Sequence, residues 1–181
     1  MNMASLRAPT GVGRIMQMAW ITPDLDRSLG QFKEIYGIGD FFVLKQSFQA
    51  EALGKKGEIS IKFALANIED MQLELIQPLG GVDSIYRDVL PTDGRHANVF
   101  HHVCVKIEGT LADWDAYVAG LGPNRPVVLT GDVGPGARFM YTDERDKLGI
   151  FVEHLWFGPE LESYMAQNVP TYQAKYGRRG K

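Results

Sequence analysis

The sequence predicts an α+β fold made of two similar units, each with the order strand–helix–strand–strand–strand (βαβββ). Alternating apolar runs typical of strands are spread along the chain, and one amphipathic helical pattern follows the first such run of each half. The same order of elements then restarts near residue 99. With 181 residues, of which 45% are hydrophobic and 23% charged, the chain is large enough to form both units.

The first module is expected over residues 14–78. A strand from Ile15 to Ile21 leads to Asp24, a good N-cap for a helix that ends at Gly37 and Gly39. The apolar face of this helix is expected to comprise Leu25, Leu29, Phe32 and Ile35. Three more strands are predicted at 41–46, 58–66 and 71–77.

A linker with a short helix at 84–90 is expected over residues 79–98, and the second module over residues 99–157. Its first strand spans 100–107, and Thr110 and Asp113 are spaced like the capping box of a helix. The apolar face of that helix should comprise Leu111, Trp114, Tyr117 or Val118, and Leu121. Strands at 126–133, 137–143 and 148–157 complete the module, and residues 158–181 form a C-terminal helix and tail.

Four polar residues occupy matching places when the two halves are aligned. Gln17 falls on His102, and Glu74 falls on Glu153, each within an otherwise apolar strand. An internal repeat of this size indicates two copies that pack as a pair and complete one site together. A single strand–helix–strand coincidence can arise in any α+β protein, but here order, length and polar positions all agree.

The four side chains suit a divalent metal ion. Two carboxylates in one apolar trough repel each other unless they are protonated or held by a cation. With one imidazole and one amide oxygen, they form a ligand set for magnesium, manganese, iron, cobalt, nickel or zinc. Taken singly, His102 could be a hydrogen-bonded core residue, Glu74 or Glu153 a surface residue, and Gln17 a core amide.

Composition and charge exclude other classes of function. The formal net charge of −3 gives nucleic acid no electrostatic attraction. Cys104 is the single cysteine, so we expect no disulfide framework and a reducing, cytoplasmic setting. No segment approaches the about 20 apolar residues of a membrane helix. Neither a nucleic acid nor a membrane is therefore the expected partner.

Residues 14–157 resemble the vicinal oxygen chelate superfamily, which includes glyoxalase, bleomycin-resistance proteins and extradiol dioxygenases. The resemblance is carried by ITPDLDRSLGQFKEIYG, LELIQPLGGVDSIYRDVL, HHVCVKI and GIFVEHL, and is nearest to the methylmalonyl-CoA epimerase branch. It implies a cupped mixed sheet around one divalent ion held by Gln17, Glu74, His102 and Glu153. Within the pair of histidines it selects His102, and strand alternation is expected to turn His101 to the opposite face. Alternation likewise turns His154 away from Glu153.

Two positions depart from the family pattern. Gln17 stands where relatives usually carry histidine, which should weaken binding of soft metals and disfavours ring-cleaving dioxygenase chemistry, since that needs two histidines. Lys56 stands where the epimerase carries the acidic residue that removes a proton. Glu58 or Glu51 could replace it only if the hairpin is shifted.

The resemblance thus implies a metal-dependent isomerase, epimerase or lyase that forms an enolate-type intermediate from a small carbonyl compound or acyl thioester. Glu153 or Glu58 would serve as the base. Lys55, Lys56, Arg125 and Arg138 are the cations available to coenzyme A phosphates.

Two alternatives remain open. A metal-free binding protein of the bleomycin-resistance type would line its trough with aromatic side chains, for which Trp20, Phe63, Phe139, Tyr141 and Trp156 are candidates. The site could also have decayed in a duplicated scaffold. We further expect a homodimer, with Tyr164, Tyr172 and Tyr176 of the tail as an arm.

Overall fold

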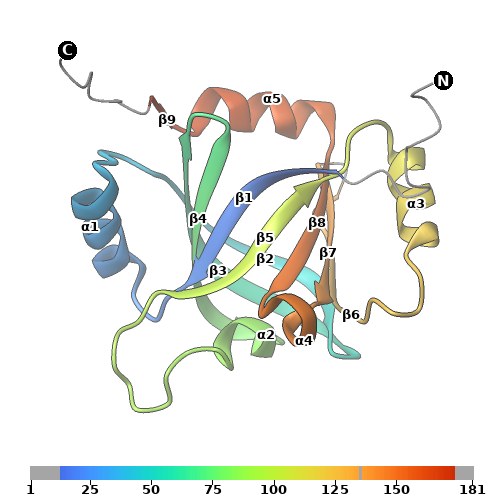
Figure 1. Ribbon diagram of the computed structural model, residues 1–181, viewed down its shortest axis with the longest axis horizontal. Helices are drawn as coiled ribbons and strands as arrows, with labels where there is room; N and C mark the ends of the chain where they lie inside the picture. The colour runs from blue at the N-terminus through green and yellow to red at the C-terminus, as the bar shows by residue number, and fades with distance from the viewer. Residues whose placement is uncertain (1–12, 135, 174–181) are drawn as a thin grey trace.

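The computed structural model describes residues 13–134 and 136–173 (Figure 1). Its strands are β1 (Arg14–Ile21), β2 (Phe42–Ala52), β3 (Lys55–Ile68), β4 (Met71–Gly81), β5 (Val99–Lys106), β6 (Val127–Asp132), β7 (Ala137–Asp143), β8 (Phe151–Phe157) and β9 (Thr171–Tyr172). Its helices are α1 (Leu25–Tyr36), α2 (Ser84–Arg87), α3 (Leu111–Gly120), α4 (Arg145–Leu148) and α5 (Pro159–Asn168).

All nine strands form one mixed sheet in the order β2-β6-β7-β8-β5-β1-β4-β3-β9. An additional β2–β3 pairing closes the strands other than β9 into a barrel. The order within the first half, β1-β4-β3-β2, is repeated in the second half as β5-β8-β7-β6. The predicted α+β fold of two βαβββ modules is therefore confirmed.

The β2–β3 hairpin is longer than the sequence pattern indicated. Its strands pair without interruption from Phe42 opposite Leu65 to Ala52 opposite Lys55. Leu53 and Gly54 form the turn with positive φ angles of 50° and 76°, the conformation that joins two twisted strands tightly. The closure to β6 uses the end of this hairpin, where Ala50 to Ala52 pair with Leu129 to Gly131.

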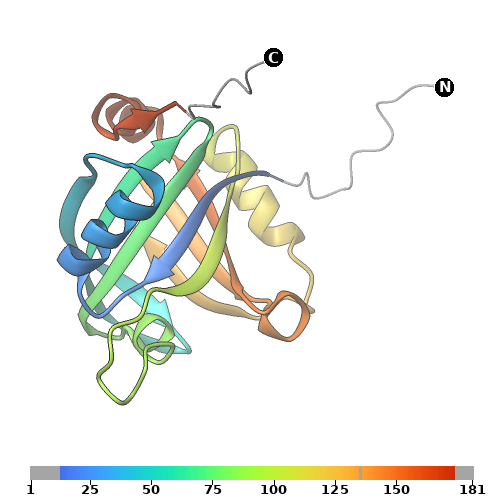
Figure 2. The same ribbon diagram turned by 60° about the vertical axis from the view of Figure 1, so that its left-hand side comes forward.

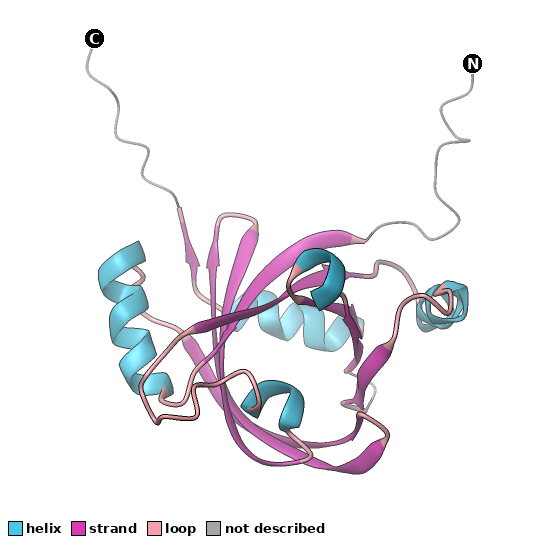
Figure 3. Ribbon diagram, turned by 60° about the horizontal axis from the view of Figure 1, so that its bottom comes forward, coloured by secondary structure: helices cyan, strands magenta, loops and turns pink. Residues whose placement is uncertain are grey.

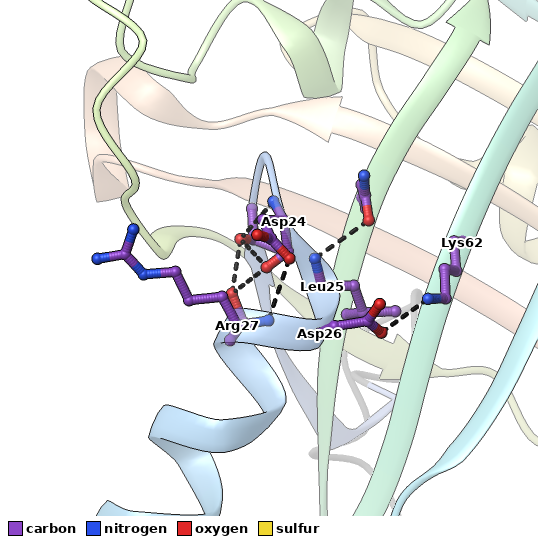
Figure 4. A network of polar contacts seen from close by, with 8 residues as sticks. Asp24, Leu25, Asp26, Arg27 and Lys62 are labelled. Atoms are coloured by element: carbon purple, nitrogen blue, oxygen red, sulfur yellow. Dashed lines mark hydrogen bonds and ion pairs between the residues drawn. The ribbon is translucent and has the colours of Figure 1, made fainter.

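Helix α1 begins and ends where the sequence predicts, on the outer face of the first module (Figure 2). The Asp24 carboxylate accepts from the backbone N–H of Arg27 at 3.1 Å, and Gly37 ends the helix with φ of +70°. An ion pair of 2.8 Å between Asp26 and Lys62 links the first turn to β3 (Figure 4). Ile35 is 70% exposed, because it lies at the edge of the apolar stripe.

Helix α3 has the predicted capping box between Thr110 and Asp113. Its apolar face is narrower than predicted: Trp114 is buried in the outer core of the second module, whereas Leu111 and Val118 are exposed. Tyr117 and Leu121, also on the predicted face, pack against the same core, so the helix covers its sheet through three of the predicted side chains.

The two ends of the barrel are covered by short helices. Helix α2 lies at one end, where Ile85 and Tyr86 enter the central core, and α5 crosses the opposite end (Figures 1 and 3). Leu161 of α5 also packs against that core.

The C-terminal segment packs on its own chain as far as it is described. Strand β9 adds to β3, and the Tyr172 hydroxyl accepts from the backbone N–H of Asp40 at 2.6 Å. Tyr164 packs edge-on against Phe42, with ring centroids 6.1 Å apart. Tyr176 lies outside the described residues, and the homodimer stays a prediction. None of the helices in the described residues is long and apolar enough to cross a membrane.

Candidate metal centre

Strand pairing places the four predicted residues at equivalent points of the two modules. Glu74 on β4 pairs with the residue two places after Gln17 on β1. Glu153 on β8 pairs with the residue two places after His102 on β5. Since β1 and β5 are adjacent in the barrel, the four residues lie on four neighbouring strands, in the order β8-β5-β1-β4.

Two β-bulges between β1 and β5 change the direction of the residues just before Gln17 and His102. Met16 is an extra residue in β1, and His101 is an extra residue in β5, between the pairs Ala19–His102 and Trp20–Phe100. The prediction that His101 faces the opposite side is therefore wrong. The bulge suspends the two-residue alternation, and both histidines point inward.

The imidazole of His102 is the centre of the site. Its Nε2 atom lies 3.4 Å from a carboxylate oxygen of Glu74, 3.4 Å from one of Glu153 and 3.4 Å from the hydroxyl of Tyr141. Glu74, His102 and Glu153 each offer one ligand atom, and these atoms lie within 4.8 Å of one another. The His102 side chain is fully buried, and the two carboxylates are 13% and 9% exposed.

Burial and neighbouring charges shift the pKa values of the ionisable groups in this cluster. Burial alone lowers the pKa of His102, but the two carboxylates outweigh it and raise the pKa to about 9. Burial raises the pKa of Glu74; contact with His102 offsets part of this rise, and the charge of Glu153 adds to it. Burial also raises the pKa of Tyr141, so its hydroxyl keeps its proton.

His101 fixes the orientation of the His102 ring. The carbonyl of Ile85 can only accept, so Nε2 of His101 donates to it at 3.0 Å. Burial, and next the charge of His102, lower the pKa of His101 to about 3, which leaves its Nδ1 as an acceptor. Nδ1 of His102 lies 2.8 Å away and therefore donates to it. This relay directs Nε2 of His102 at the carboxylates, as outer partners do for metal-ligating histidines.

The hydrogen bonds of the Gln17 side-chain amide indicate whether the site suits a cation. Its Nε2 atom donates to Oε1 of Gln72 at 2.8 Å, and Gln72 donates in turn to Asn67 at 3.1 Å. Its own Oε1 is buried with no hydrogen-bond partner among the described residues. A buried acceptor without a partner costs about 1–3 kcal/mol, which a cation would offset.

The spacing of His102 from each of the two carboxylates also fits. Atoms that share an ion at about 2.1 Å lie roughly 3.0–3.4 Å apart, depending on coordination geometry. The 3.4 Å distances from His102 to both carboxylates match this range, whereas charge-assisted hydrogen bonds are shorter, at about 2.7–2.9 Å. Glu74, His102 and Glu153 can therefore hold a divalent ion.

The cluster opens on a cavity of about 220 Å³ inside the barrel. Gln17, Glu74 and Glu153 form part of its wall. Of the aromatic residues considered from the sequence, Phe63, Phe139 and Tyr141 line it. Trp20 instead packs under α1, and Trp156 packs in the outer core beside α3.

Other candidate residues lie away from the centre. Glu58 is exposed on β3, on the face opposite Ile59 and Ile61, and the hairpin is not shifted in a way that would turn it inward. It is therefore not placed to act as the predicted base. Glu51 is exposed and lies 3.7 Å from Lys56 in a surface ion pair.

His154 lies on the outer face of β8, as strand alternation predicts. Its ring contacts the hydroxyl of Tyr117 at 2.7 Å and that of Thr142 at 3.1 Å. Burial lowers the pKa of His154 to about 4.

Sequence reasoning missed His101 as a neighbour of the ligands, and it named Tyr141 only as a candidate for lining the trough. Gln72 shares the strand face of Glu74, which is a readable signal. The bulge at His101 leaves no mark in the hydrophobic pattern.

Comparison with known proteins identifies the family. The family model described as Glyoxalase/Bleomycin resistance protein/Dioxygenase superfamily matches residues 16–141. The chain belongs to this superfamily. A search of curated proteins gave no match.

Solved structures of the same fold include several epimerases. A methylmalonyl-CoA epimerase in complex with methylmalonyl-CoA and NH4+ shares 18% identity at a TM-score of 0.55, over 82% of this chain and 96% of that one. A Streptomyces coelicolor methylmalonyl-CoA epimerase shares 18% identity at 0.54, over 81% and 98%. The Mycobacterium tuberculosis methylmalonyl-CoA epimerase shares 16% at 0.52, over 90% and 97%. At these identities the likeness concerns the fold.

Proposed function

We propose that the protein is a divalent-metal-dependent isomerase or epimerase that moves a proton on the carbon next to a carbonyl group. One observation carries this proposal: a single histidine nitrogen faces two largely buried carboxylates, and these line the same cavity as Gln17, whose amide oxygen has no partner among the described residues. Membership of the superfamily and the fold shared with methylmalonyl-CoA epimerases support it.

Glu74, His102 and Glu153 would hold the ion, with the Gln17 oxygen as a further neutral donor. When bound, the ion would supply the positive charge that stabilises the oxyanion of an enolate. The relay through His101 keeps the His102 nitrogen directed at the site, and the apolar cavity wall excludes water from the substrate.

Glu153 is proposed as the base. It lines the cavity and its side chain is only 9% exposed, so it borders the space that a substrate would occupy. The carboxylate would take the proton from the carbon next to the carbonyl and return it to the same carbon or to its neighbour. A lyase outcome would follow if a leaving group departed from the adjacent carbon.

The ligand set disfavours the ring-cleaving chemistry found in the superfamily. Ferrous oxygenases of this kind use two histidines and one carboxylate. Here one histidine stands with two carboxylates, and Gln17 occupies the place equivalent to His102.

A metal-free binding protein is the second candidate, favoured by the aromatic lining of the cavity at Phe63, Phe139 and Tyr141. The two candidates differ in metal content. A binding protein would retain its ligand after chelation, whereas the proposed enzyme would lose activity and thermal stability.

Hydrogen exchange in D₂O tests the proposal. Zinc- or magnesium-loaded protein is mixed with 2-hydroxyacetophenone or with methylmalonyl-CoA, and proton NMR follows loss of the hydrogen next to the carbonyl. We expect exchange with at least one probe, and its loss after chelation. Absence of exchange with both probes in metal-loaded protein would contradict the proposal.

A matched pair of variants tests the base. Glu153→Gln and Glu74→Gln each keep an oxygen donor and remove one carboxylate. We expect exchange to fall by about 10²–10⁴-fold in Glu153→Gln and by less in Glu74→Gln at saturating metal. Equal losses in both variants would remove Glu153 as the distinct base.

A further inference from the structure

We propose that, beyond the end of the ligand that binds the metal, the cavity selects compact, uncharged and largely apolar groups and rejects an acidic group. This inference rests on the proposed function, because it takes the metal site as the anchor of the ligand. The selection is made by the cavity residues other than Gln17, Glu74 and Glu153.

Away from Glu74 and Glu153, most of the residues that line the cavity are apolar. Strands β2 and β3 contribute side chains of alternate residues, and β7 and β8 contribute the facing side chains. The polar members from these strands, besides the hydroxyl of Tyr141, are Gln46 and Glu153. The others are Phe42, Leu44, Phe48, Ile61, Phe63, Leu65, Ala137, Phe139, Tyr141, Leu155 and Phe157. Such a surface stabilises an aromatic or aliphatic ligand in proportion to the apolar area that binding removes from water.

The cavity wall carries no positive side chain among the described residues that line it. Its charged members are Glu74 and Glu153, so a bound ion is the one source of positive charge that the proposal supplies. A carboxylate or phosphate placed away from the ion would lose its hydration without gaining a partner. It would also be repelled by any carboxylate charge that the ion does not neutralise.

The cations considered from the sequence do not line the cavity. Lys56 lies on the surface beside Glu51, and Arg138 pairs with Asp132 at 2.6 Å. Arg125 lies 4.0 Å from Glu144 near the outer face of the second module. They therefore offer no phosphate site next to the metal centre.

Helix α5 limits the size of the ligand. Its residues Leu161, Tyr164 and Met165 line the cavity, and the helix crosses one end of the barrel (Figure 1). This helix lies outside residues 16–141, the part that matches the superfamily. With α5 in place the cavity measures about 220 Å³, smaller than the roughly 300–1,000 Å³ of many small-molecule sites. We therefore assign α5 a part in this selection.

Three hydroxamates test the selection, because each chelates a metal through the same two oxygens. Benzohydroxamate carries an uncharged ring, 4-carboxybenzohydroxamate adds an acidic group, and acetohydroxamate has only a methyl group. Affinities are measured by calorimetry on cobalt-loaded protein. We expect benzohydroxamate to bind at least tenfold more tightly than either of the other two. Equal affinities for all three would overturn the inference.

A charge introduced into the wall provides the second test. Gln46 lines the cavity on β2, and Gln46→Arg would supply the missing cation. Gln49→Arg makes the same change on the same strand outside the cavity, as a matched control. We expect Gln46→Arg to raise affinity for the carboxylated probe at least tenfold relative to benzohydroxamate, and Gln49→Arg to keep the wild-type preference. An unchanged preference in a folded, cobalt-loaded Gln46→Arg protein would contradict the proposal.

Helix α5 is tested in the same assay. Met165→Ala removes part of the wall, and Gln167→Ala changes a residue of the same helix outside the cavity lining. We expect Met165→Ala to weaken benzohydroxamate several-fold while acetohydroxamate is unaffected, and Gln167→Ala to change neither. Identical behaviour of the two variants would remove α5 from the selection.

Failure of the proposed function is separable from failure of this inference. If cobalt does not bind, calorimetry with the ion alone shows it before any hydroxamate is added, and both proposals fail. If cobalt binds at the expected site and the three probes bind equally, the metal centre stands and the selectivity is wrong.

Discussion

Replacement of Gln17 by histidine probes the point at which this chain departs from its relatives. In the structure the Gln17 amide nitrogen donates to Gln72 at 2.8 Å, and its oxygen is buried without a partner among the described residues. Gln17→His would keep an N–H donor for Gln72 and replace the unpartnered oxygen by an imidazole nitrogen.

The expected change in stability is small for the metal-free protein. If the substitution removed the hydrogen bond to Oε1 of Gln72, the protein would lose about 1–3 kcal/mol of stability. The N–H of the histidine ring can still donate to this oxygen, so we expect no such loss. The imidazole nitrogen that replaces the unpartnered oxygen is itself an acceptor without a partner, so that penalty stays about the same. We therefore expect the free energy of unfolding to change by less than about 1 kcal/mol, measured by denaturant titration.

The expected change in metal affinity is larger and depends on the ion. Imidazole is the better donor for zinc, nickel and cobalt, so zinc should bind at least about tenfold more tightly, equivalent to about 1.4 kcal/mol. Magnesium prefers oxygen and should gain nothing. Gln17→Leu, which offers neither donor nor ligand, is the control and should weaken both ions.

Calorimetric titration of zinc and magnesium into the wild type and both variants decides between the two interpretations of Gln17. If Gln17 is only a core amide, the histidine variant is destabilised and its zinc affinity is unchanged. That combination would refute the assignment of Gln17 as a ligand.

Three further substitutions test other parts of the account. His101→Phe keeps the ring packing but removes the acceptor for His102, and should lower zinc affinity by about 10–100-fold in calorimetry; unchanged affinity would refute the relay. Gly131→Ala places a Cβ 2.1 Å from the Phe139 ring and should destabilise the protein by about 1–3 kcal/mol in denaturant titration. Thr110→Ala removes the cap of α3 and should cost about 1 kcal/mol by the same measurement.

The sequence predicts much of the fold because its signals are local and occur twice. Asp24 and Gly37 bound α1 through capping geometry that depends on neighbouring residues alone. The alignment of Gln17 with His102 corresponds to equivalent registers in the two modules, which explains why the repeat identified the residues at the centre.

The features that sequence analysis missed depend on tertiary structure. His101 turns inward because a bulge adds one residue to β5, and no local pattern marks the bulge. Glu58 was considered through resemblance, although its alternation with Ile59 and Ile61 already places it on the outer face. The contribution of α5 to the cavity follows from how the helix packs across the barrel, which its own ten residues do not reveal.

Anomalous diffraction from a cobalt-soaked crystal tests the central claim most directly. The account predicts one strong peak about 2.0–2.2 Å from Nε2 of His102 and from carboxylate oxygens of Glu74 and Glu153. A map with no peak at this position, and with His102 bonded only to the two carboxylates at a cobalt concentration that saturates other sites, would contradict it.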